Sequence, residues 1–101
     1  MIEDTRDGAT VTIRLNRPPA NAFTAEGLAA LTETVDGLNR DANVRAIVIT
    51  GTGPKFFSAG ADLNQFADGD RAHARVAAQR FGAAFEALQN ARAVTIAAIN
   101  G

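Results

Sequence analysis

Polar and apolar residues alternate over residues 10–15, which is the first regular pattern along the chain. A period of two predicts a strand with one buried face. The residues of that face are Val11, Ile13 and Leu15. Two prolines follow at positions 18 and 19. Because proline cannot donate to a ladder of backbone hydrogen bonds, the strand is expected to end before them.

The pattern then changes to a helical period. Four apolar residues recur at spacings of three, four and three, which places them on one face of a helix. They are Leu28, Leu31, Val35 and Leu38. Thr24 is a suitable N-cap, and Glu26 lies in the first turn, where the helix dipole favours an acidic side chain. The polar residues 39–43 are expected to end this helix.

A nearly continuous β-branched run over residues 44–50 predicts a strand that is buried on both faces. Residues 51–54 contain two glycines and a proline and are expected to form a turn. A short stretch of small residues follows, and a helix is expected to start near Asp62.

The last third of the chain predicts one more helix and one more strand. The helix is expected from His73 to Asn90, and its apolar face consists of Ala77, Phe81, Phe85 and Leu88. Residues 94–99 predict a second strand of the buried type. Because strands alternate with helices, the chain is expected to be an α/β protein with a mainly parallel sheet. Since an apolar strand runs directly into Asn100-Gly101, residues 1–101 are interpreted as the N-terminal part of a longer domain.

Composition narrows the classes of protein that the chain can represent. It has 101 residues, 47% of them apolar, but 22 are alanine, so the expected core is modest. A net charge of −1 argues against a nucleic-acid arm, and the chain has no cysteine and only one histidine, His73, which cannot hold a metal alone. Met1 to Asp4 lack the features of a signal peptide, and the longest apolar run is too short to span a membrane. We therefore expect a cytoplasmic protein without metal, membrane or nucleic-acid partners.

Residues 47–63 are the segment with the most suggestive chemistry. A P-loop would need Ser or Thr after Lys55, and a dinucleotide-binding turn would need a third glycine at position 56, but Phe56 stands there. What remains is a bend of small residues at 58–61, where Gly60 tolerates dihedral angles that other residues avoid. Free N–H groups at such a bend can stabilise an oxygen that gains negative charge. The alternative is a tight connection in which Asp62 is only a helix N-cap.

Four motifs in order resemble the crotonase superfamily of enoyl-CoA hydratases and isomerases. They are Leu15-Asn16-Arg17-Pro18, Asn21-Ala22-Phe23-Thr24, Phe57-Ser58-Ala59-Gly60-Ala61-Asp62-Leu63 and Val94-Thr95-Ile96-Ala97-Ala98-Ile99-Asn100-Gly101. The resemblance covers the whole chain and implies the N-terminal part of the ββα superhelix of that family. The resemblance says far less about which reaction of that family the protein catalyses.

The resemblance also implies roles for individual residues. The backbone N–H of Ala61 is the counterpart of a family donor to the thioester carbonyl. The residues implied to contact the coenzyme A moiety are Asn21, Ala22, Ala59, Gly60, Ala61, Asp62 and Leu63. Asn64 stands where the family often has a basic residue that assists the phosphates. Lys55 or Arg17 could replace that basic residue, or each could be an ordinary solvated charge.

The activity implied by the resemblance is stabilisation of a thioester enolate, first of all in the hydration of a 2-enoyl-CoA as in fatty-acid oxidation. Isomerisation, hydrolysis, decarboxylation and dehalogenation are alternatives, as is an inactive module that binds coenzyme A. The second carbonyl donor and the acid–base carboxylates would lie beyond Gly101, so the 101 residues alone are expected to be inactive. No cofactor is implied apart from the coenzyme A of the substrate, and the family suggests a homotrimer or hexamer.

The remaining candidates favour structural roles. His73 is expected to be solvated, and Asp68 and Asp70 to be loop and helix-start residues. Five phenylalanines are expected to pack in the core rather than to contact an acyl chain. They are Phe56, Phe57, Phe66, Phe81 and Phe85.

Overall fold

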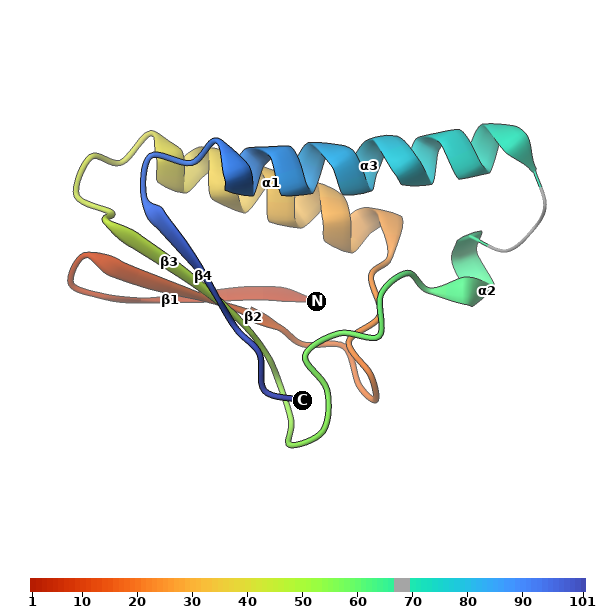
Figure 1. The fold of residues 1–101 in the computed structure, drawn as a ribbon, viewed down its shortest axis with the longest axis horizontal. Helices are drawn as coiled ribbons and strands as arrows, with labels where there is room; N and C mark the ends of the chain where they lie inside the picture. Colours follow the sequence, from red (N-terminus) through yellow and green to blue (C-terminus); the bar gives the residue numbers. More distant parts are fainter. Residues whose placement is uncertain (67–69) are drawn as a thin grey trace.

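The computed structural model describes residues 1–66 and 70–101, and it has two layers, with helices covering one face of a sheet (Figure 1). The strands are β1 (Ile2–Asp7), β2 (Thr10–Leu15), β3 (Ala46–Gly51) and β4 (Val94–Ala98), and the helices are α1 (Ala25–Asn39), α2 (Leu63–Phe66) and α3 (Arg71–Gln89). The sheet order is β1-β2-β3-β4, in which β3 runs parallel to both of its neighbours. The expected α/β fold with a mainly parallel sheet is confirmed.

Strand β1 has no counterpart in the expectations from the sequence. It pairs antiparallel with β2 through a turn in which Gly8 has a φ of 61°. Four of its six residues are charged, and all except Ile2 are exposed. An edge strand held by backbone hydrogen bonds on one side needs no apolar alternation, which explains why the pattern did not reveal it.

The core lies between α1 and the centre of the sheet, as the periodicity predicts. The buried side chains of β2 and of α1 pack in one cluster with Ile47 and Ile49 of β3. Thr24 caps α1 and accepts a hydrogen bond from the N–H of Gly27 at 2.9 Å. The expectation that β3 is buried on both faces is wrong, because Ala46 and Val48, on the face away from the helices, are only partly buried.

The predicted burial of the last strand is also wrong, whereas the predicted apolar face of the last helix holds in part, because Ala77 is buried and Phe81 and Leu88 pack against the core. All of β4 is exposed, and Ile96 pairs in register with Val48, so it lies on the sheet face that no described element covers. Helix α3 begins two residues earlier than expected, and its buried residues are Ala77 and Ala84, while Phe85 is 53% exposed. This burial depends on which parts of the chain cover each face, and local periodicity carries no information about that.

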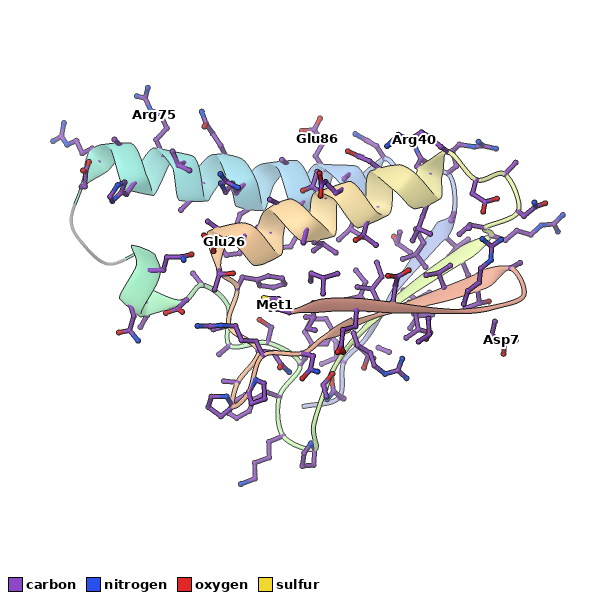
Figure 2. All side chains as sticks on the ribbon, turned by 180° about the vertical axis from the view of Figure 1, so that it is seen from behind. Met1, Asp7, Glu26, Arg40, Arg75 and Glu86 are labelled. Carbon is purple, nitrogen blue, oxygen red and sulfur yellow. The ribbon has the colours of Figure 1, made fainter. Side chains whose placement is uncertain are left out.

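The outer face of α3 is polar. Arg75 and Glu86 point away from the sheet (Figure 2). Within the described residues, no helix is both long and apolar enough to cross a membrane.

Candidate functional site

Two segments that are far apart in the sequence run side by side next to α2. The N–H of Ala59 donates to the carbonyl of Ala20 at 3.0 Å, and the N–H of Phe23 donates to the carbonyl of Gly60 at 2.7 Å. The N–H of Asp62 returns to the carbonyl of Phe23 at 2.9 Å. The small-residue bend is therefore aligned with the chain that leads into α1.

This pairing determines the direction of the Ala61 N–H. In extended chain, successive residues direct their backbone groups to opposite edges. The Gly60 carbonyl and the Asp62 N–H both form hydrogen bonds with the backbone of Phe23. The N–H of Ala61, which lies between them in the sequence, therefore points away from Phe23. No acceptor for this N–H is found among the residues that the structure describes. The Ala61 N–H is therefore left as a donor without an acceptor among the described residues.

The bend is shaped by Ser58 and Gly60. The Ser58 hydroxyl donates to the carbonyl of Asn21 at 2.8 Å and accepts from the N–H of Gly60 at 3.1 Å. Gly60 has a φ of 92°, in the region that favours glycine, as expected from the sequence.

Gly60→Ala is expected to lower the free energy of unfolding by about 1–2 kcal/mol. An added Cβ would meet nothing within 4 Å, so the cost comes from the backbone alone. Gly37→Ala is the control, because Gly37 lies within α1 and has the same open space at an ordinary φ. Urea unfolding should show a lower free energy of unfolding for Gly60→Ala and a free energy of unfolding raised by about 0.5–1 kcal/mol for Gly37→Ala. Equal effects would contradict the assignment of strain to position 60.

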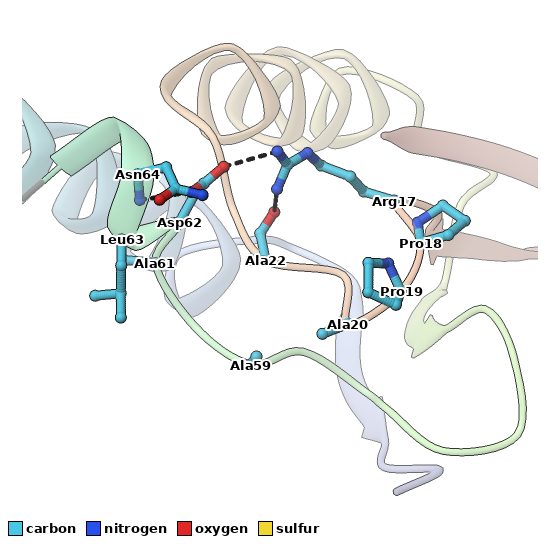
Figure 3. Close-up of a pocket in the computed structure, with 10 residues that line it drawn as sticks. All are labelled: Arg17, Pro18, Pro19, Ala20, Ala22, Ala59, Ala61, Asp62, Leu63 and Asn64. Carbon is cyan, nitrogen blue, oxygen red and sulfur yellow. Dashed lines mark hydrogen bonds and ion pairs between the residues drawn. The ribbon is translucent and has the colours of Figure 1, made fainter.

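A pocket of about 510 Å³ lies beside this bend (Figure 3). It is lined by Arg17, Pro18, Pro19, Ala20, Ala22, Ala59, Ala61, Asp62, Leu63 and Asn64. Small and apolar side chains dominate the wall, which leaves backbone groups accessible to a ligand. Its volume lies in the range of small-molecule sites. Five of the seven residues that the sequence suggested lie in this wall, whereas Asn21 and Gly60 do not.

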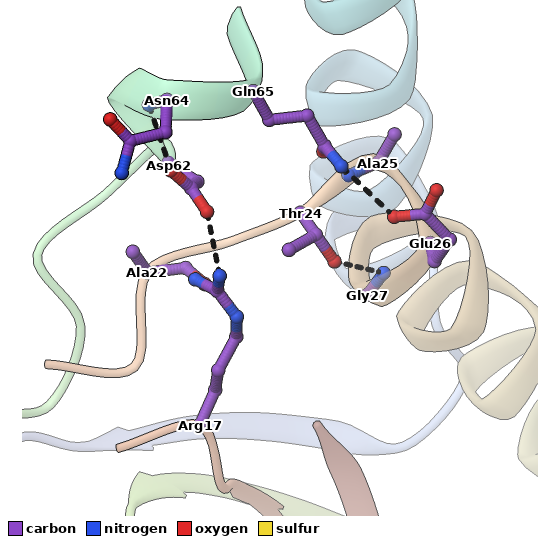
Figure 4. Close-up of polar contacts among 9 residues, drawn as sticks. All are labelled: Arg17, Ala22, Thr24, Ala25, Glu26, Gly27, Asp62, Asn64 and Gln65. Carbon is purple, nitrogen blue, oxygen red and sulfur yellow. Dashed lines mark hydrogen bonds and ion pairs between the residues drawn. The ribbon is translucent and has the colours of Figure 1, made fainter. Parts of the chain in front are cut away.

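Arg17 and Asp62 form an ion pair at the pocket wall, with 2.7 Å between Nη2 and Oδ2 (Figure 4). Arg17 also donates to the carbonyl of Ala22 at 3.1 Å, and the Asp62 carboxylate accepts from the N–H of Asn64 at 2.9 Å. Burial raises the pKa of Asp62, but the hydrogen bonds from Asn64 and Arg17 outweigh it, so this pKa lies below its usual value. Asp62 thus caps the start of α2 through its bond from the N–H of Asn64 and also lines the pocket, and its contact with coenzyme A stays a prediction.

The two cations that were considered as phosphate contacts differ in position. Arg17 lines the pocket but is engaged with Asp62, and its side chain is 40% exposed. Lys55 is exposed and lies outside the pocket wall.

Asn21 has a role that the sequence did not reveal. It is 1% exposed and has a φ of 53°, a conformation that asparagine tolerates better than most residues. Its Nδ2 donates to three carbonyls of the loop after β3, those of Thr52 at 3.1 Å, Phe56 at 3.1 Å and Phe57 at 3.3 Å. Its Oδ1 accepts from the N–H of Arg17 at 2.9 Å. The only signal in the sequence was an asparagine after two prolines, which is typical of turns in general.

The other candidates lie away from this pocket. His73 lines a separate pocket of about 260 Å³ together with Glu26 and Gln65. Asp70 is the N-cap of α3, whereas Asp68 lies outside the described residues.

The phenylalanines divide into two groups. Phe57 and Phe81 pack against the core, as expected. Phe56 is 40% exposed and Phe85 is 53% exposed, so the expectation of core packing is wrong for these two. The side chain of Phe66 lies outside the described part of the chain.

Comparison with known proteins gives a consistent set of relatives. The family model described as enoyl-CoA hydratase/isomerase matches residues 5–101. Carnitinyl-CoA dehydratase from Salmonella arizonae is 39% identical over 96% of this chain. A structure of DspI from Pseudomonas aeruginosa matches 99% of the chain with a TM-score of 0.96 and 55% identity. An enoyl-CoA hydratase from Bacillus anthracis also matches 99%, with a TM-score of 0.94 and 33% identity.

These relatives are considerably longer than the 101 residues. The chain spans 37% of the Salmonella protein, 38% of the DspI chain and 40% of the Bacillus chain. The 101 residues, and the candidate site within them, therefore correspond to only a part of each relative.

Proposed function

The chain belongs to the enoyl-CoA hydratase/isomerase family, and from this premise we propose that the complete protein binds an acyl-CoA thioester and stabilises its enolate. We further propose that its reaction is the hydration of a 2-enoyl-CoA. The observation that carries this proposal is the unused N–H of Ala61 beside a pocket lined by small residues. A backbone N–H can donate to a thioester carbonyl only if the ligand comes close to the backbone.

The proposed chemistry needs a polarised thioester carbonyl. In hydration, water gives one proton to a base while its oxygen bonds to C3, the C2–C3 π pair shifts so that the carbonyl oxygen takes up negative charge as an enolate, and a proton is then delivered to C2. A backbone N–H can stabilise that negative oxygen without a histidine or a cysteine. Ala61 is the proposed donor in this chain. The resemblance implies that a second donor and the acid–base carboxylates follow Gly101, so the 101 residues alone are not expected to turn over substrate.

The pocket wall is the proposed contact surface for the coenzyme A moiety. The proposed contacts are Ala22, Ala59, Ala61, Asp62 and Leu63, all of which line the pocket. Asn21 and Gly60 are proposed to act indirectly, by shaping the segments that carry these contacts. Arg17 is the only cationic residue in the described wall, and Asn64 is uncharged. Arg17 would approach a phosphate only while sharing its charge with Asp62.

Incubation of the complete protein with a 2-enoyl-CoA tests this function. Hydration is expected to remove the absorbance of the conjugated thioester and to give a product heavier by one water. A product of unchanged mass with a displaced double bond would instead assign the protein to the isomerases of the family. Binding of coenzyme A without any turnover would contradict the enzymatic function and favour an inactive binding module.

Several expectations from the sequence stay predictions. These are the cytoplasmic location, the homotrimer or hexamer, the role in fatty-acid metabolism and the absence of cofactors and of nucleic-acid partners.

A further inference from the structure

The loop of residues 52–57 leads from β3 into the bend that carries Ala61. Residues 52–56 are all exposed, so this part of the loop has no buried side chain to anchor it. Its position therefore depends on hydrogen bonds to its backbone, since little apolar surface holds it in place.

The side chain of Asn100, which follows β4, supplies two of these hydrogen bonds and two more to the end of β3, one of them from the Thr50 hydroxyl to Oδ1 at 3.5 Å. Its Oδ1 accepts from the N–H of Gly51 at 2.9 Å. Its Nδ2 donates to the carbonyl of Gly53 at 3.0 Å and to that of Phe56 at 3.1 Å. One half-buried amide thus links the end of β3 to two carbonyls of the loop.

Asn100 acts together with Asn21. The Phe56 carbonyl accepts from Nδ2 of both asparagines at 3.1 Å. Asn21 also accepts, through its own carbonyl, the Ser58 hydroxyl that shapes the bend. The two amides come from the segment before α1 and from the end of β4, so they hold the loop from two sides.

The backbone of the loop is also closely packed against Gly51 and Gly101. A Cβ added to Gly51 would lie 2.6 Å from the Cα of Phe57, and one added to Gly101 would overlap the carbonyl of Lys55. The loop therefore has little room to shift while Asn100 is present. Gly101 itself lies directly against the backbone of Lys55 in this loop.

We propose that Asn100 is a positioning residue that sets the location of the Ala61 N–H relative to the chain beyond Gly101. This proposal rests on the proposed function. Because two donors must meet one carbonyl oxygen, the segments that carry them need a fixed relative position. The amide of Asn100 fixes the loop that leads to Ala61 against the end of β4, which is the starting point of the following segment.

An asparagine is suited to this position by its chemistry. Its side chain offers one acceptor to an N–H and two donor hydrogens to two carbonyls. Aspartate keeps the acceptor toward Gly51 but places a second oxygen against the carbonyls of Gly53 and Phe56. Alanine removes all four side-chain contacts.

The test compares Asn100→Ala and Asn100→Asp with the wild type in the complete protein. We expect kcat to fall about 10- to 100-fold while KM and the Kd for free coenzyme A change less than about threefold. The hydrogen bonds of the Asn100 side chain go to residues outside the described pocket wall, so binding of coenzyme A should persist. Asn43→Ala is the control, because Asn43 is an exposed asparagine on the α1–β3 connection.

Infrared spectroscopy of a bound ¹³C-labelled acyl-CoA provides a second readout. A well-placed donor lowers the stretching frequency of the thioester carbonyl, and this shift should decrease in both Asn100 variants but not in Asn43→Ala. A structural role alone would lower the melting temperature without changing the carbonyl frequency in the folded protein.

The outcomes separate this proposal from the function on which it rests. If the wild type polarises the carbonyl and the folded Asn100 variants keep both the shift and kcat, the positioning role is wrong and the function stands. If neither variant folds, Asn100 is a determinant of the fold and the proposal is overturned. If the wild type itself binds acyl-CoA without a shift of the carbonyl frequency, the proposed function is wrong, and with it the role of Asn100.

Discussion

Replacing Asn21 with aspartate is expected to lower the free energy of unfolding by about 3 kcal/mol at neutral pH. Asn21 is 1% exposed, and its Nδ2 is the donor to three loop carbonyls. A carboxylate of the same shape has no hydrogen to donate, so it would place buried negative charge against these oxygens. Only the Arg17 N–H, which donates to Oδ1, would remain as a favourable partner.

Chemical unfolding in urea measures this effect, and Asn21→Gly is the matched variant. Glycine accepts the positive φ of this position but lacks the amide, so its loss should be smaller, about 1–2 kcal/mol. Lowering the pH should reduce the deficit of the aspartate variant, because a protonated carboxyl regains one donor. An aspartate variant as stable as the wild type at pH 7 would show that the amide does not hold the loop.

Ala61→Pro is expected to reduce kcat/KM of the complete protein about 100-fold or more. Proline has no backbone N–H, so the proposed donor to the thioester carbonyl is lost. No hydrogen bond within the described part of the chain uses this N–H, so the substitution removes no backbone pairing from the fold. The effect should therefore appear in catalysis more than in stability.

Steady-state hydration kinetics check this prediction, with circular dichroism to verify the fold. Ala61→Gly is the control, because it keeps the N–H and removes only a methyl group from the pocket wall. Its rate should stay within a few-fold of the wild type. A folded proline variant with an undiminished rate would rule out Ala61 as a carbonyl donor.

The core elements could be predicted from the sequence because local periodicity reports which side chains share a face. The alternation over β2 and the spacing of Leu28, Leu31 and Val35 correspond to the buried faces in the structure. Thr24 is the N-cap of α1, as its side-chain chemistry indicates. The pattern fails for β1 and β4, which lie at the two edges of the sheet. Exposure at an edge depends on neighbouring elements rather than on local sequence.

The candidate site, too, has features that the sequence predicts and features that depend on the tertiary structure. The sequence by itself indicated a run of small residues at 58–61 with a glycine that tolerates unusual dihedral angles, and Gly60 does have a positive φ, because side-chain size and backbone freedom are local properties. Only the tertiary structure decided that Arg17 pairs with Asp62, 45 residues away, and that Asn21 and Asn100 meet at the carbonyl of Phe56. Hydrogen bonds and ion pairs depend on distances that the fold creates, so residues remote in sequence show their partners only after folding.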